Sequence, residues 1–317
     1  PGDVLHNAYG YGLFTGGIGM HYGAEAAGCT VVPAGGGRTA QQILLLKDLG
    51  ARVLCATPSY ALNLGYAIEE SGLPLSDFKL EIGIFGAEPW TELLRHQIEE
   101  KLGIKAFDIY GMSELSGPGV SIECAEGRQG LHIWEDHFLA EVIDPASGEI
   151  LPEGAEGELV MTTLSKEAAP LLRFRTGDLT AITRQPCRCG RTMARMTRVR
   201  ARIDDMLIIR GVNVYPSEIE NILLAIDELA PHYQLILSRE KALDELCVQV
   251  EIKATLSSPQ TNFAAEEEDR HLSELATKVK YLLKDGLGLT AAVELLPSGA
   301  INRSQGKACR LVDLRES

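Results

Sequence analysis

The sequence has little positive charge and no long apolar run. Lys and Arg total 30 against 44 Asp and Glu, so the formal net charge is −14 at pH 7. A nucleic-acid-binding surface needs a basic patch, so this balance argues against a nucleic-acid partner. No stretch of about 18 apolar residues is present, so we expect no membrane-spanning helix.

The cysteines are few and irregularly spaced. The seven cysteines form no regular framework, and no signal-peptide pattern is visible. Both features favour a reducing, cytoplasmic location. The chain begins at Pro1 rather than Met, in what reads as the middle of a domain, so we expect that N-terminal residues are missing. The 317 residues suffice for two domains with a substantial core.

Apolar runs alternate with amphipathic segments through the first part of the chain. Periodicity predicts strands at 30–33, 52–56, 81–85 and 107–110, separated by helices at 41–49, 60–70 and 91–102. This alternation predicts a mostly parallel sheet with crossover helices. Ligands bind beyond the carboxyl ends of such strands, so the loops after Phe85 and Tyr110 are the expected sites.

The pattern then changes twice. Short strands at 139–143 and 157–162, joined by turns, predict antiparallel structure from Phe138 onward. Beyond Asp205 the pattern predicts a helix at 217–224 that opens with a Ser217/Glu220 capping box, then strands at 233–237, 246–252 and 293–295 and a helix at 271–283. The predicted class is α/β. A large domain at 1–203 holds the parallel sheet and an antiparallel subdomain, and a small mobile α+β domain occupies 204–317.

Four polar motifs follow one another along the chain. Residues 110–114 read Tyr-Gly-Met-Ser-Glu after a predicted strand, and residues 174–178 read Phe-Arg-Thr-Gly-Asp. Residues 202–216 join the two predicted domains. Lys307 follows a glycine in a polar segment, where a flexible stem can deliver a point charge to an anionic group. Each motif alone is also typical of an ordinary turn, linker or surface charge.

In this order and spacing the four motifs resemble the adenylate-forming superfamily, which comprises acyl-CoA synthetases, peptide-synthetase adenylation domains and luciferases. Residues 6–17, 85–90 and 205–216 are similar, more narrowly, to the phenylacetate–coenzyme A ligases. The resemblance runs over residues 1–314. It implies an adenylation domain followed by a small lid domain. The family's Ser/Thr/Gly-rich phosphate loop, which lies upstream in those enzymes, is absent from this sequence.

The resemblance implies a ligase that joins an aryl acid to coenzyme A in phenylacetate catabolism. Phenylacetate, ATP and CoA would give phenylacetyl-CoA, AMP and pyrophosphate through an acyl-adenylate. Attack of a carboxylate on a phosphate brings two anions together, so cations must be aimed at the developing charge. Three alternatives stay open: another aryl acid, a carrier-protein thiol as acceptor, or a non-catalytic nucleotide- or acyl-CoA-binding module. Relatives of this type are often homodimers, which favours a homodimer by analogy.

The resemblance also carries residue roles to matching positions. Lys307 would bridge the substrate carboxylate and the α-phosphate of ATP, with Ser113 beside that phosphate. Glu114 would bind Mg²⁺, a hard ligand for a hard cation. Asp178 would accept hydrogen bonds from the ribose hydroxyls, helped by Arg202. The other nucleotide-binding positions are Gly86, Ala87, Glu88, Pro89, Asp108, Tyr110, Gly111 and Met112.

Further positions follow for the acid, the thiol and the hinge. The aryl pocket would be lined by Tyr9, Phe14, Ala87, Ile109 and Pro118. Tyr9 and Phe14 also fit the alternative of ordinary core aromatics. Gly211 and Asn213 would approach the CoA thiol after the small domain rotates about Asp204. Asp204 also fits the alternative of a plain polar linker.

Cysteine supplies a second, independent constellation. Cys187 and Cys189 lie in a Cys-Arg-Cys-Gly turn, and Cys124 and His132 lie upstream. Three thiolates and one imidazole would complete a closed tetrahedral zinc site of the structural type. Because Cys-x-Cys replaces the usual Cys-x-x-Cys, reduced thiols without a metal stay open as the alternative. The other four cysteines fit core or surface positions without a special role: Cys29, Cys55, Cys247 and Cys309.

Overall fold

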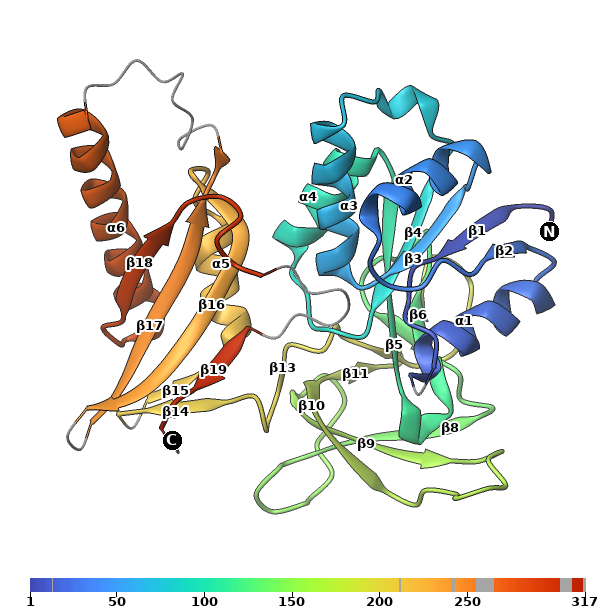
Figure 1. Ribbon diagram of the computed structural model, residues 1–317. Coiled ribbons are helices and arrows are strands. Elements are labelled where there is room, and N and C mark those ends of the chain that lie inside the picture. Colours follow the sequence, from blue (N-terminus) through green and yellow to red (C-terminus); the bar gives the residue numbers. More distant parts are fainter. Residues whose placement is uncertain (13, 211, 241–242, 255–264, 303–309, 316–317) are drawn as a thin grey trace. The chain divides into compact units, whose positions relative to one another are not determined.

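The computed structural model describes residues 1–12, 14–210, 212–240, 243–254, 265–302 and 310–315. The chain divides into two compact units, Pro1–Asp204 and a second that begins at Asp205 (Figure 1). Each unit has its own buried apolar clusters. None of the helices in the described part of the chain is both long and apolar enough to cross a membrane.

The first unit is built on a nine-stranded sheet. Its strands, in chain order, are β1 (Val4–Asn7), β2 (Thr30–Val32), β3 (Val53–Ala56), β4 (Ile82–Gly86), β5 (Lys105–Met112), β6 (Gly117–Glu123), β7 (Leu131–Ile133), β11 (Ile182–Thr183) and β12 (Arg195–Met196). Their spatial order is β11-β12-β7-β6-β5-β4-β3-β1-β2. The strands from β2 to β5 pair in parallel, and those from β6 to β11 continue the sheet antiparallel. The predicted α/β class is confirmed, and the antiparallel strands extend the parallel sheet itself.

Four helices cover this sheet. They are α1 (Thr15–Ala26), α2 (Thr39–Asp48), α3 (Pro58–Glu70) and α4 (Glu92–Leu102). The chain runs from β1 outward to β2 and then returns to β3, β4 and β5. Because right-handed crossovers in opposite directions use opposite faces, α1 lies on one face and the other three helices on the other (Figure 1). This arrangement leaves the loops after β4 and β5 at the carboxyl edge of the parallel strands.

Helix α1 was not predicted from the sequence, because glycine is a poor helix former. Its glycines are explained by close packing instead. A Cβ at Gly17 would lie 2.2 Å from the carbonyl oxygen of Gly10, and one at Gly19 would lie 2.7 Å from the ring of Pro118. The helix therefore approaches β6 and the segment after β1 more closely than a helix with larger side chains could.

A second, four-stranded antiparallel sheet completes the first unit. It has the order β13-β10-β9-β8, with β8 at Phe138–Ile143, β9 at Gly157–Thr163, β10 at Phe174–Thr180 and β13 at Ala201–Arg202. The pairing of β9 with β10 shifts register between Arg175 and Leu179. Gly177 within that irregularity has φ +77°, a conformation that favours glycine. The irregular register reorients the short segment from Thr176 to Asp178.

The second unit is a small α+β domain. It contains the hairpin β14 (Leu207–Ile209) and β15 (Val212–Val214), the helices α5 (Pro216–Leu224) and α6 (Ala265–Leu287), and the strands β16 (Leu229–Glu240), β17 (Leu243–Ile252), β18 (Ala292–Leu296) and β19 (Leu311–Asp313). The last four form a sheet of order β18-β17-β16-β19. Helix α5 packs on β16, α6 packs on β18, and the two helices contact each other.

The predicted capping box of α5 was wrong by two residues. The helix starts at Pro216 with Tyr215 as its N-cap, and Glu218 accepts a hydrogen bond of 3.4 Å from the backbone N–H of Tyr215. Proline at the first helical position fixes a helical φ and needs no hydrogen-bond acceptor, so it sets the earlier start. Glu220, expected in the box, is instead buried and paired with Arg310.

Candidate active site

The loop after β4 is held in one conformation from both sides. A Cβ at Gly86 would lie 2.1 Å from the carbonyl oxygen of Ile109, so β4 and β5 can meet here only through glycine. Ala87 has φ +70°, which is costly for a residue with a Cβ and persists where the surroundings enforce it. The carboxylate of Glu88 accepts a hydrogen bond of 2.6 Å from the backbone N–H of Ser59, at the N-terminus of α3. The Glu88 carboxylate is therefore engaged by α3, and residues 87–89 line the cavity described below.

The end of β5 turns into a short 3₁₀ helix, Ser113–Leu115. A Cβ at Gly111 would lie 2.3 Å from the carbonyl oxygen of Gly117, so the turn back into β6 requires glycine there. Lys166 donates a hydrogen bond of 2.6 Å to the backbone carbonyl of Glu114. The side chains of Ser113 and Glu114 are exposed. The turn is thus anchored through its backbone while its hydroxyl and carboxylate stay accessible.

Tyr110, Asp178 and Arg202 meet between the two sheets of the first unit. Tyr110 Oη donates a hydrogen bond of 2.6 Å to Asp178 Oδ2, and Arg202 Nη1 donates one of 2.9 Å to Asp178 Oδ1. Burial raises the pKa of the Asp178 carboxyl, and the bonds from Tyr110 and Arg202 oppose that rise. Burial also raises the pKa of Tyr110, and the nearby Asp178 charge adds to this effect. Tyr110 therefore donates as a neutral phenol.

Arg202 also binds the residue predicted as the hinge. Its Nε and Nη2 donate hydrogen bonds of 2.9 Å each to the two carboxylate oxygens of Asp204. Such a two-point guanidinium–carboxylate pair fixes direction as well as distance. Asp204 ends the segment Pro1–Asp204, so the chain passes into the second unit from a point tied to the Asp178 cluster.

These groups line one cavity of about 390 Å³, within the usual range of roughly 300–1,000 Å³ for small-molecule sites. All but one of the predicted nucleotide residues of the first unit line it: Ala87, Glu88, Pro89, Asp108, Tyr110, Gly111, Met112, Asp178 and Arg202. Gly86 does not line it and lies directly before the loop. Ser113 and Glu114 line it as well. The structure therefore brings the loops after β4 and β5 and the strand β10 to a single hollow.

A smaller cavity of about 40 Å³ adjoins it. The five residues predicted for the aryl pocket all line this space: Tyr9, Phe14, Ala87, Ile109 and Pro118. The rings of Tyr9 and Phe14 lie 6.3 Å apart. Tyr9 is also part of a buried apolar cluster, whereas Phe14 is 41% exposed. The two cavities share Phe14, Ala87 and residues 109–113, so they form neighbouring compartments of one site.

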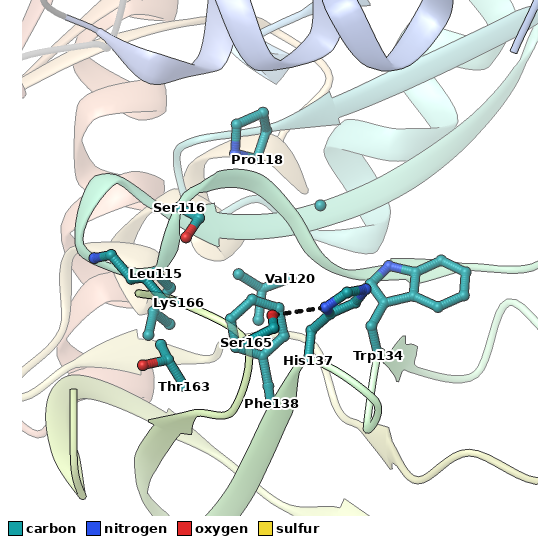
Figure 2. A pocket seen from close by; sticks show the side chains of 11 residues that line it. Leu115, Ser116, Pro118, Val120, Trp134, His137, Phe138, Thr163, Ser165 and Lys166 are labelled. Carbon is teal, nitrogen blue, oxygen red and sulfur yellow. Dashed lines mark hydrogen bonds between the residues drawn. The ribbon is translucent and has the colours of Figure 1, made fainter. Parts of the chain in front are cut away.

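A third hollow lies next to the Glu114 turn. Its volume is about 190 Å³. Figure 2 shows the side chains that line it, with Pro118 on one side and the ring of Phe138 on another. The imidazole of His137 shares a hydrogen bond of 2.8 Å with the Ser165 hydroxyl at its rim. Lys166, which holds the Glu114 carbonyl, also lines it. Pro118 lines both this hollow and the smaller apolar cavity.

Sequence reasoning missed Arg198, which lines the large cavity. Its guanidinium lies over the Trp90 ring at 4.8 Å and forms ion pairs with Asp108 at 3.0 Å and Glu92 at 2.9 Å. Burial raises the pKa of the Asp108 carboxyl to about 7, and the neighbouring Glu123 charge adds to this rise. The run of arginines between 195 and 202 was the available signal, because that density of cations beside a polar motif suggests buried acidic partners.

Some predicted residues cannot be placed in the cavity. Lys307 and Gly211 lie outside the described residues. Asn213 belongs to the second unit, where it is exposed in β15 opposite Ile208. The four predicted metal ligands, in contrast, come together in the first unit. The ligand atoms of Cys124, His132, Cys187 and Cys189 all lie within 4.8 Å of one another.

Comparisons with known proteins fit this geometry. Residues 3–165 match the family model for AMP-binding enzymes, and residues 211–315 match that for the C-terminal domain of AMP-binding enzymes. A phenylacetate–coenzyme A ligase of Thermus thermophilus is 52% identical over the whole chain, which spans 72% of that protein. The chain belongs to the phenylacetate–coenzyme A ligase family of AMP-binding enzymes.

Two further relatives support this family assignment. A phenylacetate–coenzyme A ligase of Escherichia coli is 47% identical over 99% of the chain and 70% of that protein. A crystal structure of 2-hydroxyisobutyryl-CoA ligase, in the postadenylation state with R3-HIB-AMP, matches with a TM-score of 0.90 and 32% identity. That match covers 100% of this chain and 66% of the other. The family resemblance predicted from the motifs is confirmed.

Proposed function

We propose that the protein is an ATP-dependent ligase that joins phenylacetate to coenzyme A and releases AMP and pyrophosphate through an acyl-adenylate. One observation carries this proposal. A cavity that presents the Asp178 carboxylate and the Glu114 turn opens beside a small apolar compartment lined by Tyr9 and Phe14. Such a site can hold a nucleotide and an aryl acid side by side, which the proposed first step requires.

Asp178 and Arg202 support ribose binding. Asp178 is held from both sides by Tyr110 and Arg202, so its carboxylate has a fixed direction. A buried carboxylate of this kind accepts hydrogen bonds from the two ribose hydroxyls at little cost in reorganisation. The rigid backbone from Gly86 to Pro89 lines one wall for the adenine, and Tyr110 and Asp108 line the other.

Glu114 and Ser113 support binding of the phosphates with Mg²⁺. Glu114 offers an exposed carboxylate on the cavity wall, which is the type of ligand that Mg²⁺ prefers. The Ser113 hydroxyl lies 3.2 Å from the Thr15 hydroxyl, so two hydroxyl groups face the same side of the turn. Mg²⁺ would neutralise the charge of the departing pyrophosphate, and Ser113 would donate a hydrogen bond to the α-phosphate.

The domain predicted at 204–317 would supply the remaining groups. In this proposal it is a lid domain that moves about Asp204, whereas the first unit is the adenylation domain. Lys307 bridges the substrate carboxylate and the α-phosphate during adenylation, and Gly211 and Asn213 approach the CoA thiol afterwards. The family assignment and the motif at 202–216 support these roles.

The apolar compartment supports a small aryl acid. Ile109, Pro118 and the two aromatic rings give it apolar walls. Two alternatives concern specificity: another aryl acid, or a carrier-protein thiol as acceptor. A third is a non-catalytic nucleotide- or acyl-CoA-binding module. Cytoplasmic location and a homodimeric state are further parts of the proposal, supported by composition and by analogy within the family.

Phenylacetate-dependent exchange of labelled pyrophosphate into ATP tests the proposal, measured on the full gene product that contains these 317 residues. We expect exchange to depend on phenylacetate and to be lost in Lys307→Ala. That variant should still convert supplied phenylacetyl-AMP and CoA to thioester, because the two anions no longer need to be brought together. Lys280→Ala, which changes an exposed lysine of α6, is the matched control.

The outcomes separate the alternatives. Exchange with a different aryl acid, but not with phenylacetate, would replace the proposed substrate. Thioester formation on a carrier protein but not on CoA would replace the acceptor. Nucleotide binding without exchange, for any acid in a panel, would favour the non-catalytic module and overturn the proposal.

A further inference from the structure

The four-residue cluster at one end of the nine-stranded sheet has no part in the proposed reaction. Cys124 directly follows β6, and His132 is the central residue of β7. Cys187 and Cys189 lie in the loop between β11 and β12. Residues from three separated parts of the chain therefore converge on one point, outside the set of residues that line the large cavity.

Two of the distances between the ligand atoms are close to those around a tetrahedral metal, and all the ligand atoms lie within 4.8 Å of one another. Two sulfurs bound to one zinc at about 2.3 Å are about 3.8 Å apart, and a sulfur and a nitrogen about 3.6 Å apart. The Sγ atoms of Cys124 and Cys187 lie 3.6 Å apart, and Cys189 Sγ lies 3.4 Å from His132 Nε2. Three soft sulfurs and one imidazole are the donor set that zinc prefers in structural sites.

The surroundings of the cluster are shaped around the sulfurs. A Cβ at Gly127 would lie 2.7 Å from Cys187 Sγ and 2.9 Å from Cys124 Sγ, so only glycine lets the backbone approach this closely. Gly190 has φ +81° and donates its N–H to the Cys187 carbonyl at 3.0 Å, which closes the Cys-x-Cys turn. Gly127 is thus required by the two sulfurs, whereas Gly190 is required by the conformation of the turn.

We propose that Cys124, His132, Cys187 and Cys189 bind one Zn²⁺ in a structural site. With four protein ligands the ion has no open position for a substrate, so it does not act as a Lewis acid in the ligase reaction. Binding releases the thiol protons and leaves three thiolates on one Zn²⁺, a net charge of −1 that the neighbouring Arg191 guanidinium offsets. This inference is independent of the proposed function.

The ion joins the loop between β11 and β12 to the β6–β7 hairpin. Strand β12 pairs with β7, with Arg195 opposite His132, so the metal lies at the point where this pairing begins. The chain continues from β12 to Arg198 and Arg202, which line the large cavity. Metal loss would therefore loosen the segment that presents these two arginines, although neither touches the metal ligands.

Metal content of the purified protein, prepared with reductant and without chelator, tests the proposal. Mass spectrometry of the acid-digested protein should give one zinc per chain. Titration of the native protein with a mercurial thiol reagent should release that zinc into a colorimetric chelator in step with the modification of three thiols. This measurement needs no variant and therefore does not depend on how a substituted chain folds.

Variants then locate the ion. Cys189→Ser and Gly127→Ala should each lower the zinc content well below one per chain, and Co²⁺ substitution of the native protein should give the thiolate charge-transfer absorption of a tetrahedral site. Cys29→Ser, a cysteine remote from the cluster, should keep one zinc. Native protein that holds no metal and takes up neither Zn²⁺ nor Co²⁺, or that forms a Cys124–Cys187 disulfide in place of binding metal, would overturn the proposal.

Discussion

The phenol of Tyr110 donates a hydrogen bond of 2.6 Å to the Asp178 carboxylate, and this bond joins β5 of the nine-stranded sheet to β10 of the four-stranded sheet. No strand of one sheet pairs with a strand of the other among the residues that the structure describes. The side-chain bond therefore links the two sheets at the cavity wall and fixes the direction of the carboxylate.

Tyr110→Phe should lower both the stability of the protein and its affinity for ATP. The substitution keeps the ring but leaves one buried carboxylate oxygen without its donor, and a hydrogen bond to a charged group contributes about 1.5–3 kcal/mol. Urea unfolding should show a loss of that order, and the KM for ATP should rise. Unchanged stability and unchanged KM would show that Tyr110 does not hold Asp178. Tyr281→Phe, an exposed tyrosine of α6, is the control.

Arg198→Ala should destabilise the first unit strongly. Above pH 7, where the Asp108 carboxyl is ionised, the change leaves Asp108 and Glu92 without this cation. Removing one partner of a largely buried ion pair costs about 3–5 kcal/mol. Arg200→Ala, two residues away, breaks an exposed pair with Glu156 and should cost at most about 1 kcal/mol. Thermal or urea unfolding measures both. Equal losses in the two variants would contradict the structural role of Arg198.

Asp108 should make the stability of the protein pH-dependent. Burial raises the pKa of its carboxyl from the ordinary 3.8 to about 7. The folded state thus holds the proton more tightly than the unfolded state, so this contribution to stability is complete below the unfolded pKa and is lost as pH rises through about 7.

Asp108→Asn tests this dependence, because an amide cannot titrate. The free energy of unfolding of the native protein, minus that of the variant, should fall as pH rises from about 4 to 7. Urea unfolding at a series of pH values gives this difference. A difference that is constant with pH, or that grows as pH rises, would show that the carboxyl is not held protonated by burial.

Ile109→Ala should shift acid specificity. Ile109 is 9% exposed and lines the small apolar cavity, so its truncation enlarges the space and removes contacts with the acid. A mismatch of even one methylene group in an apolar pocket is worth about 1–3 kcal/mol, so kcat/KM for phenylacetate should fall by at least about 10-fold while bulkier aryl acids gain relative to it. Ile208→Ala, an exposed position of β14, should leave the ratio unchanged. An unchanged ratio for Ile109→Ala would remove this residue from the acid pocket.

Strands of the parallel sheet were predictable because each is a short run of apolar residues, and such a run can be recognised from neighbouring residues alone. The predicted strands at 52–56 and 81–85 match β3 and β4 to within one residue at either end. Helix α1 was missed, because its glycines are explained by contacts with Gly10 and Pro118, which are not local in sequence. The N-cap of α5 was misplaced because a Ser-x-x-Glu pattern follows Pro216, which starts the helix earlier.

The sequence predicted those parts of the candidate site in which a recognisable motif lies at the carboxyl end of a predicted strand. The loops after β4 and β5 were expected at the carboxyl edge of the sheet, and both line the large cavity. Arg198 could not be identified, because its importance comes from Trp90 and Asp108, which are distant in sequence. The cysteine and histidine spacing indicated a cluster, but only the fold shows that β6, β7 and the loop after β11 converge.

A crystal structure of the full gene product with a non-hydrolysable analogue of phenylacetyl-adenylate tests the central claim most directly. We predict that the phenyl ring enters the compartment lined by Tyr9, Phe14 and Ile109, and that the ribose hydroxyls bind Asp178. An analogue bound outside the cavity between the two sheets of the first unit, or with its ring remote from that compartment, would contradict the account.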